Sequence, residues 1–223
     1  IEWTDATWTT VTGCTKISQE GFDLKLHPDL LELPLKWKQP KRIFVNSMSD
    51  LFHKDVPNEF ILKVFETMVK AKHHTFQVLT KRSERMMNWC ESNFSRFTIA
   101  ELSNIWLGVS VENNEQIFRI EHLENIPTII RFLSLEPLLE SLNWSFELSI
   151  IDWVIVGGES GPGARRMNVE WVREIRDNCV EHGIPFFFKQ WGEYNQHGEK
   201  VGRKAAGRIL DRKVWSEFPI RWK

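Results

Sequence analysis

Seven short runs rich in β-branched and aromatic residues constrain the fold more than any other feature of this chain. They predict strands at 9–13, 42–47, 75–80, 105–111, 129–135, 152–158 and 185–190. The runs do not alternate strictly between apolar and polar residues, which is typical of a parallel sheet buried on both faces. We therefore predict an α/β fold with a parallel, TIM-like (β/α) barrel, either closed or partial and open. A doubly wound sheet is the alternative, because sequence does not give strand order.

Two amphipathic helices are predicted between these strands. The first covers 57–72, with Pro57 at its start and apolar residues on one face. The second covers 169–183, with Gly183 as its stop. Their apolar faces consist of Phe60, Val64, Phe65 and Met68 in the first, and Trp171, Val172, Ile175 and Cys179 in the second.

Length and composition favour one soluble domain over residues 1–223, with a basic extension from about 193 to 223. A chain of 223 residues that is 42% hydrophobic can bury a full core without disulfides. The net charge of −1 provides no global attraction to DNA or membrane, and no apolar run could span a bilayer. Three widely spaced cysteines form no disulfide framework, so we expect a cytoplasmic location.

Polar residues follow six of the predicted strands. The carboxyl ends of parallel strands build the active sites of such folds, so we take these residues as candidates. The alternative is that strand ends are polar only because they meet water. The candidates are Asn46, Ser47, Ser49, Asp50, Thr80, Lys81, Arg82, Ser110, Glu112, Asn113, Ser134, Glu136, Gly157, Gly158, Glu159, Ser160, Lys189, Gln190 and Trp191.

The carboxylates among these candidates need compensation. Glu112, Glu136 and Glu159 would repel one another on a shared rim. We expect Lys81, Arg82, Lys189, a metal ion or the amino group of a ligand to neutralise them.

The glycine-rich stretch at 156–167 can bring backbone N–H groups close to a phosphate, a carboxylate or a nucleoside. It matches neither a Walker A loop nor the full dinucleotide-binding pattern. A tight turn followed by a Pro-Gly turn explains it equally well.

The three cysteines differ in context. Cys179 lies on an apolar helical stripe, and both it and Cys90 are predicted to be core thiols. Cys14 is an isolated cysteine at the end of a predicted strand, and the neighbouring pair His73 and His74 lacks helical metal-ligand spacing.

Several stretches together resemble a bacteriophage-associated family without an assigned function. They are IEWTDATW, TGCTKIS, RIFVNSMSDLFH, TFQVLTKR, WLGVSVEN, RFLSLEPLL, DWVIVGGESGPGARRM, PFFFKQWG and KAAGRILD, which cover nearly the whole chain in order. That family looks like a member of the radical S-adenosylmethionine (SAM) superfamily. Its members carry a second cysteine and a Cys-x-x-Cys ending after TGCTK-S. Three such thiolates would hold a [4Fe–4S] cluster, with its fourth iron open to SAM.

This sequence departs from the family pattern after Ser18, where it passes directly to QEGFDLKLHPDLL. We expect a further segment, carrying the other two cysteines, to belong between Ser18 and Gln19. A parallel connection needs a crossover of a dozen or more residues, and the proline-broken stretch before residue 42 is a poor one. Under the resemblance, Cys14 is the first of three cluster ligands.

The resemblance implies that the reduced cluster cleaves SAM to give a 5′-deoxyadenosyl radical, which abstracts hydrogen from an unknown substrate. It also implies an electron donor as a partner that reduces the cluster. The implied cofactor-binding residues are Asn46, Ser47, Ser49, Asp50, Ser110, Glu112, Asn113, Gly157, Gly158 and Glu159. Those on the substrate side are Thr80, Lys81, Arg82, Glu136, Lys189, Gln190, Arg203, Lys204 and Arg208. The basic stretch at 200–213 favours a nucleic acid or nucleotide as substrate, although a solvated surface segment is an equal explanation.

Two other classes remain open. One is a barrel hydrolase or isomerase that holds a divalent metal through Asp50, Glu112, Glu136 and Glu159, because such ions prefer oxygen ligands. The other is a non-catalytic nucleic-acid-binding protein, which the basic stretch and eleven tryptophans would suit.

Overall fold

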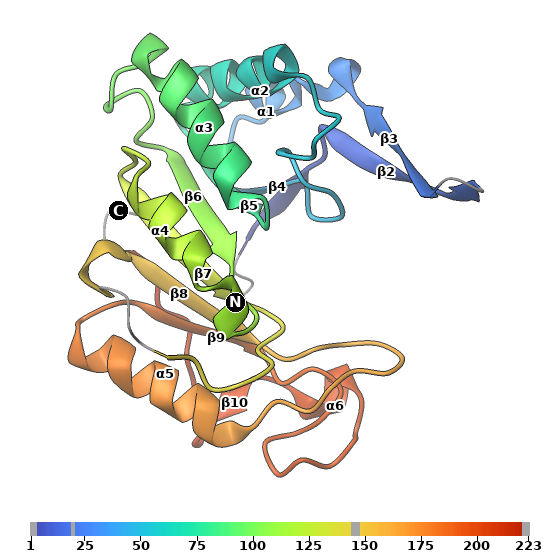
Figure 1. The fold of residues 1–223 in the computed structure, drawn as a ribbon, viewed down its shortest axis with the longest axis vertical. Helices are drawn as coiled ribbons and strands as arrows, with labels where there is room; N and C mark the ends of the chain where they lie inside the picture. The colour runs from blue at the N-terminus through green and yellow to red at the C-terminus, as the bar shows by residue number, and fades with distance from the viewer. Residues whose placement is uncertain (1–3, 19–20, 144–147, 220–223) are drawn as a thin grey trace. The chain divides into compact units, whose positions relative to one another are not determined.

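The computed structural model describes residues 4–18, 21–143 and 148–219 (Figure 1). The chain divides into two compact units. Unit 1 contains residues 109–124 and 130–223, together with Ile1, and unit 2 contains residues 2–108 and 125–129. The single-domain expectation stays a prediction, and each unit is described by itself.

A seven-stranded parallel sheet confirms the predicted fold class. Its strand order follows chain order, as in a TIM-like barrel that is partial and open. The strands in order are β1 (Ala6–Trp8), β4 (Arg42–Val45), β5 (Thr75–Thr80), β6 (Ile105–Ser110), β7 (Ile130–Leu135), β8 (Trp153–Gly157) and β9 (Phe186–Gln190). Six of the seven predicted strands coincide with these elements to within two residues at either end.

In unit 2, α2 (Asn58–Lys70) and α3 (Ser83–Asn93) follow β4 and β5. The predicted helix at 57–72 is confirmed, since Pro57 stands at the N-cap of α2 and its predicted apolar face is buried. The two helices contact each other, with the ring of Phe65 centred 4.5 Å from that of Trp89. The short elements of this unit are η1 (Pro28–Leu30), α1 (Leu33–Lys36) and η2 (Phe94–Arg96).

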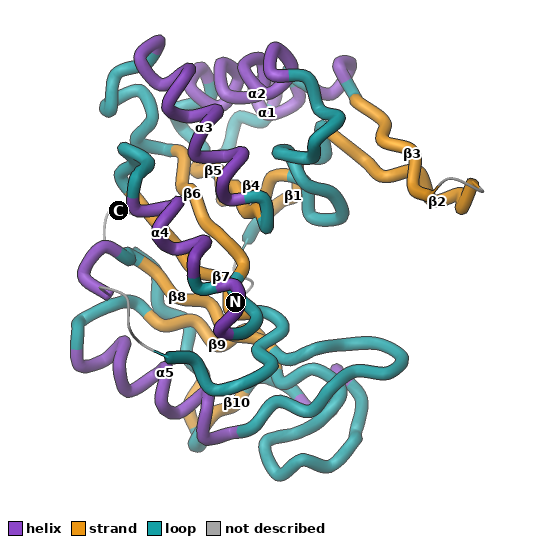
Figure 2. The backbone as a smooth tube through the Cα atoms, viewed as in Figure 1, coloured by secondary structure: helices purple, strands orange, loops and turns teal. Residues whose placement is uncertain are grey.

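In unit 1, α5 (Val169–Glu181) confirms the second predicted helix. The Asn168 side chain accepts a hydrogen bond from the Glu170 N–H at its start, and Gly183, with φ of 67°, follows its end. Figure 2 shows mostly loop beyond β9. The remaining elements are η3 (Asn114–Gln116), α4 (Phe118–Glu124), η4 (Leu148–Ile150), α6 (Arg203–Ala206), β10 (Ile209–Leu210) and β11 (Lys213–Val214). No helix in the described ranges is long and apolar enough to cross a membrane.

The predicted strand at 9–13 is wrong. The sheet strand β1 ends at Trp8, and β2 (Val11–Ser18) pairs antiparallel with β3 (Gly21–Leu26) in a separate two-stranded sheet. Figure 2 shows this hairpin extending away from β1 and β4. The cause is Asn46, whose side-chain oxygen accepts hydrogen bonds from the N–H groups of Thr10 at 2.7 Å and Val11 at 3.1 Å, and so holds the chain where it leaves the sheet.

Cys14 therefore lies within β2 and not at the end of a sheet strand, which corrects the sequence-based expectation. A register shift falls between Gly13 and Ile17, around this position. The side chain of Cys14 lies outside the described residues, and so does the expected discontinuity at Gln19.

The other two cysteines are core thiols, as predicted. Cys90 and Cys179 are each 0% exposed. Burial raises the pKa of both thiols, that of Cys179 to about 12. Neither is available as a thiolate near neutral pH.

A buried histidine fixes the chain before β4. His74 is 1% exposed. Its Nδ1 accepts a hydrogen bond from the Lys41 N–H at 3.1 Å, and its Nε2 lies 3.0 Å from the Pro34 carbonyl oxygen. Only a neutral ring with its proton on Nε2 satisfies both contacts. Burial lowers the pKa of His74 below its ordinary value of 6.5.

We predict that His74 makes unfolding pH-dependent. Because the unfolded chain binds the proton more readily, the stability that His74 contributes is complete above about pH 7 and is lost as pH falls below about 6.5. Replacing His74 with Gln should lower the slope of unfolding free energy against pH, by at most about 1.4 kcal/mol per pH unit. Urea unfolding between pH 5 and 8 measures this slope, with His182→Gln, a change of an exposed histidine, as the matched control. Equal slopes for wild type and His74→Gln would contradict the prediction.

Candidate functional site

In unit 2, the ends of β4 and β5 are joined through one carboxylate. Both oxygens of Asp50 accept hydrogen bonds of 2.8 Å from the Thr80 hydroxyl, and the Arg82 guanidinium donates another at 2.8 Å. The Asp50 side chain is only 14% exposed. These three predicted site residues thus form a hydrogen-bonded bridge between the strand ends.

The other candidates after β4 divide into bonded and exposed residues. The Asn46 side chain is 3% exposed and is engaged by Thr10 and Val11. The Ser49 hydroxyl donates to the Val11 carbonyl oxygen. Ser47 is exposed, as is Lys81 after β5. Among the predicted cofactor-binding residues after β4, Ser47 is therefore the exposed one.

In unit 1, the end of β6 carries a buried ion pair. Arg119 Nη1 lies 2.9 Å from Glu112 Oε2 and donates to the Ser110 carbonyl oxygen at 2.7 Å. The two charged side chains are 12% and 10% exposed. Sequence analysis missed Arg119, because Glu112 lies in the loop before α4 and the spacing between the two residues carries no helical signal. The next residue, Asn113, has a buried side-chain oxygen without a hydrogen-bond partner in the described structure.

A second polar group in unit 1 joins the ends of β7, β8 and β9. Lys189 Nζ donates to Glu136 Oε2 at 2.7 Å, as predicted from the need for a cation. Gln190 Nε2 contacts Glu136 Oε1 at 3.3 Å and Ser160 Oγ at 3.1 Å. Lys189 and Glu136 retain 29% and 20% side-chain exposure, so solvent or a ligand can reach both charges. We call Glu136, Ser160, Lys189 and Gln190 the unit 1 polar cluster.

Beside this cluster, Glu159 has its own cation. Arg165 donates from Nε and Nη2 to the two Glu159 oxygens, each at 2.8 Å. Hydrogen bonds from the Arg165 side chain and backbone hold the pKa of Glu159 at about 2. Glu159 therefore stays ionised throughout the physiological range. Sequence analysis did not identify Arg165 as this partner.

Two glycines allow the loops after β8 and β9 to meet. A Cβ on Gly158 would lie 2.0 Å from the Trp191 carbonyl oxygen, and one on Gly192 would lie 2.1 Å from that of Glu159. Backbone hydrogen bonds from Gly158 to Gln190 and from Glu193 to Glu159 join the same loops. The glycine-rich stretch thus serves a close backbone approach, and that approach positions Ser160 against Gln190.

The strand-end carboxylates are neutralised one by one. Asp50, Glu112, Glu136 and Glu159 pair with Arg82, Arg119, Lys189 and Arg165, respectively. Within the described ranges, no group of three or more His, Cys, Asp or Glu side chains could hold a metal ion. The divalent-metal alternative stays a prediction.

The basic stretch at 200–213 separates into anchored and exposed cations. Arg208 donates to the Trp215 carbonyl oxygen at 2.9 Å and to Ser216 Oγ at 2.7 Å, and its guanidinium lies 4.5 Å from the Phe187 ring centroid. Desolvation lowers the pKa of Arg208. Arg203 and Lys204, on α6, are exposed. Arg208 is thus a packing residue, whereas the α6 cations are exposed, as are Lys200, Arg212 and Lys213.

These features define an α/β protein with polar, internally bonded strand ends. The chain belongs to a family described as "Protein of unknown function (DUF5131)", whose model matches residues 19–219. No curated protein and no solved structure matches the chain.

We predict that Gly158→Ala destabilises the fold strongly. The new Cβ would meet backbone atoms that cannot move independently, at a cost of about 2 kcal/mol or more. Gly157→Ala is the matched control, because its Cβ would meet only the Glu136 side chain. It should cost less than about 1 kcal/mol. Urea unfolding midpoints compare the two, and equal losses would show that the loops after β8 and β9 can separate freely.

Proposed function

We propose that this chain binds S-adenosylmethionine at the carboxyl ends of its parallel strands and is an enzyme of the radical SAM type. The observation that carries the proposal is the unit 1 polar cluster, which sets a partly exposed carboxylate and ammonium beside a glycine turn at three successive strand ends. The chain-order parallel sheet and the motif resemblance support it.

The cysteines of this chain do not by themselves fit a [4Fe–4S] cluster. Such a cluster needs three accessible thiolates. Cys90 and Cys179 are fully buried, and burial raises the pKa of both. Cys14 alone remains as a ligand, so the cluster requires the further segment expected after Ser18. We derive no reaction step through it.

The residues of unit 1 can bind and orient a ligand. Lys189 can donate to a carboxylate or phosphate, and Glu136 can accept from an amine or hydroxyl, since each is partly exposed. Glu159 supplies a permanent negative charge because Arg165 holds its pKa at about 2. A ligand with both an ammonium and a carboxylate matches this distribution of charges.

We predict that SAM binds to the purified protein, expressed from its own gene, and that Glu159→Gln weakens binding about tenfold, or about 1.4 kcal/mol. The loss is expected because the substitution removes the negative charge of Glu159, which directly follows Gly157 and Gly158. Glu170→Gln is the control, because Glu170 is an exposed carboxylate that also pairs with an arginine, Arg173. Isothermal titration calorimetry measures both affinities. Absence of SAM binding to the wild type would refute the proposal.

The cluster has a separate test on the same preparation. Peptide mapping by mass spectrometry would reveal the further segment as extra residues between Ser18 and Gln19. After anaerobic reconstitution, Cys14→Ala should lose bound iron and Cys179→Ala should retain it. A direct Ser18–Gln19 peptide together with no iron binding would remove the radical SAM assignment, even if SAM binds.

For the substrate, the exposed cations of α6 favour a phosphate-bearing molecule such as a nucleic acid or nucleotide. We predict that replacing Arg203 and Lys204 with Ala weakens binding of a single-stranded oligonucleotide. The slope of log K against log salt should fall by about 1.4, the value for two phosphate contacts. Lys63 and Lys70 on α2, both exposed, provide a charge-matched double-alanine control. Equal salt slopes for the two variants would leave α6 without this role.

A further inference from the structure

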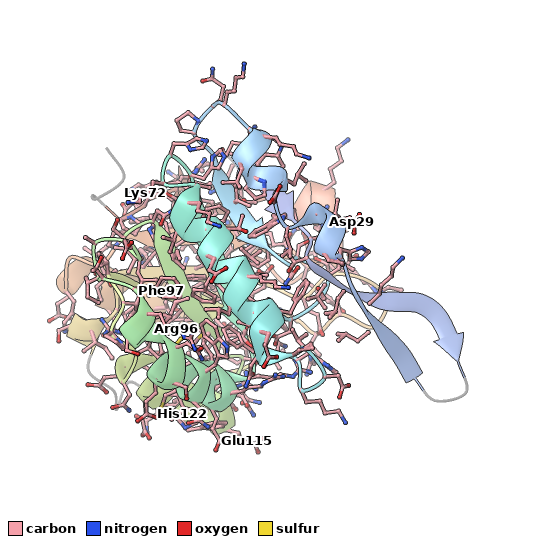
Figure 3. All side chains as sticks on the ribbon, turned by 90° about the horizontal axis from the view of Figure 1, so that it is seen from above. Asp29, Lys72, Arg96, Phe97, Glu115 and His122 are labelled. Atoms are coloured by element: carbon pink, nitrogen blue, oxygen red, sulfur yellow. The ribbon has the colours of Figure 1, made fainter. Side chains whose placement is uncertain are left out.

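Unit 2 contains a cavity of about 730 Å³ away from every candidate site residue. Most of its wall comes from the end of α3 and from the segment that leads into β6, so it lies toward the amino end of that strand. The candidate site residues follow the carboxyl ends instead. Figure 3 labels Arg96 and Phe97 in this part of unit 2. We call this cavity the α3–β6 pocket.

The wall of the α3–β6 pocket combines apolar side chains with polar groups. Phe94 and Leu102 are 8% and 2% exposed, whereas Ile99 is 50% exposed and so presents its side chain to solvent. The apolar lining residues are Met87, Phe94, Phe97, Ile99, Leu102 and Pro127. Cavities of 300–1,000 Å³ with such walls accommodate the apolar body of a small organic ligand.

One charged residue lines the pocket. Glu91, on the last turns of α3, is exposed, and no ion pair or hydrogen bond of its side chain occurs within the described ranges. The other polar lining residues are Ser95 and Asn125, which are uncharged. A carboxylate at the rim of an apolar cavity favours a cation and disfavours an anion.

Cys90 does not supply a reactive nucleophile to this pocket. Cys90 also lines the pocket, but it is 0% exposed, and burial raises the pKa of its thiol. A thiol that is neither ionised nor accessible does not react with a ligand.

We propose that the α3–β6 pocket binds a small organic cation, namely a protonated amine attached to an aromatic or aliphatic body. The body fills the apolar cavity, and the ammonium group meets Glu91 at the rim. This site is independent of SAM, of iron and of the strand-end residues.

Three probes with one body and different head groups test the proposal. These are 4-phenylbutylamine, 4-phenylbutanol and 4-phenylbutyrate, titrated calorimetrically into the full chain at pH 7. We expect the amine to bind at least fivefold tighter than the alcohol, and the carboxylate to bind weakest. Glu91→Gln should remove the advantage of the amine and leave the alcohol unchanged. An advantage that persists in Glu91→Gln, or equal binding of amine and carboxylate, would overturn the proposal.

The position of binding is tested by methyl NMR of the five methionines. The Met87 methyl signal should shift on addition of the amine, whereas that of Met48, which is 88% exposed on the loop after β4, should not. Met87→Trp, which fills the cavity, should abolish binding of both amine and alcohol while the thermal unfolding midpoint shows that the variant is folded. Should that variant unfold, the Met87 signal of the wild type decides alone, and a shift confined to other methionines would overturn the proposal.

Discussion

The approach of two backbones at Gly158 and Gly192 is the constraint on which the unit 1 site depends. No side chain larger than hydrogen fits at either position, because carbonyl oxygens lie about 2 Å from the ideal Cβ positions. The approach fixes the loop after β8 against the loop after β9. It thereby brings Gln190 within hydrogen-bonding distance of Ser160 and leaves Lys189 facing Glu136. The polar cluster therefore depends on the backbone shape at this approach.

In each unit, the carboxylates at the strand ends are paired with cations. Every carboxylate there has a dedicated arginine or lysine within 2.9 Å, and the pairs differ mainly in exposure. Truncating one partner of a buried pair leaves an uncompensated charge, which costs several kcal/mol. The Glu112–Arg119 pair is of this kind, whereas Glu159 and Arg165 are more exposed and contribute less to stability. The pairs at Glu136 and Glu159 are partly open, and these are the carboxylates that the proposed SAM site uses.

The fold was largely predictable, because buried parallel strands and amphipathic helices leave periodic signals that depend on local sequence. Phe60, Val64 and Phe65 indicated α2 in this way, and the burial of Cys90 and Cys179 followed from the same pattern. The hairpin of β2 and β3 was missed, since Asn46, 36 residues from Thr10, determines where the chain leaves the sheet. Charge partners were only partly predictable. Sequence shows that Glu112 and Glu159 need cations, but side-chain direction selects Arg119 and Arg165.

The anchoring of the hairpin at its root bears on how the chain tolerates insertions. Asn46 holds Thr10 and Val11 at the root, and Ser49 adds a hydrogen bond to the Val11 carbonyl oxygen. These hydrogen bonds therefore hold the chain at the ends of β1 and β4 independently of the residues that follow Ser18. Lengthening a loop at the far end of such a ribbon adds only about 0.6 kcal/mol of closure entropy per doubling of its length. Segments of very different length could therefore be accommodated there while the parallel sheet keeps its register.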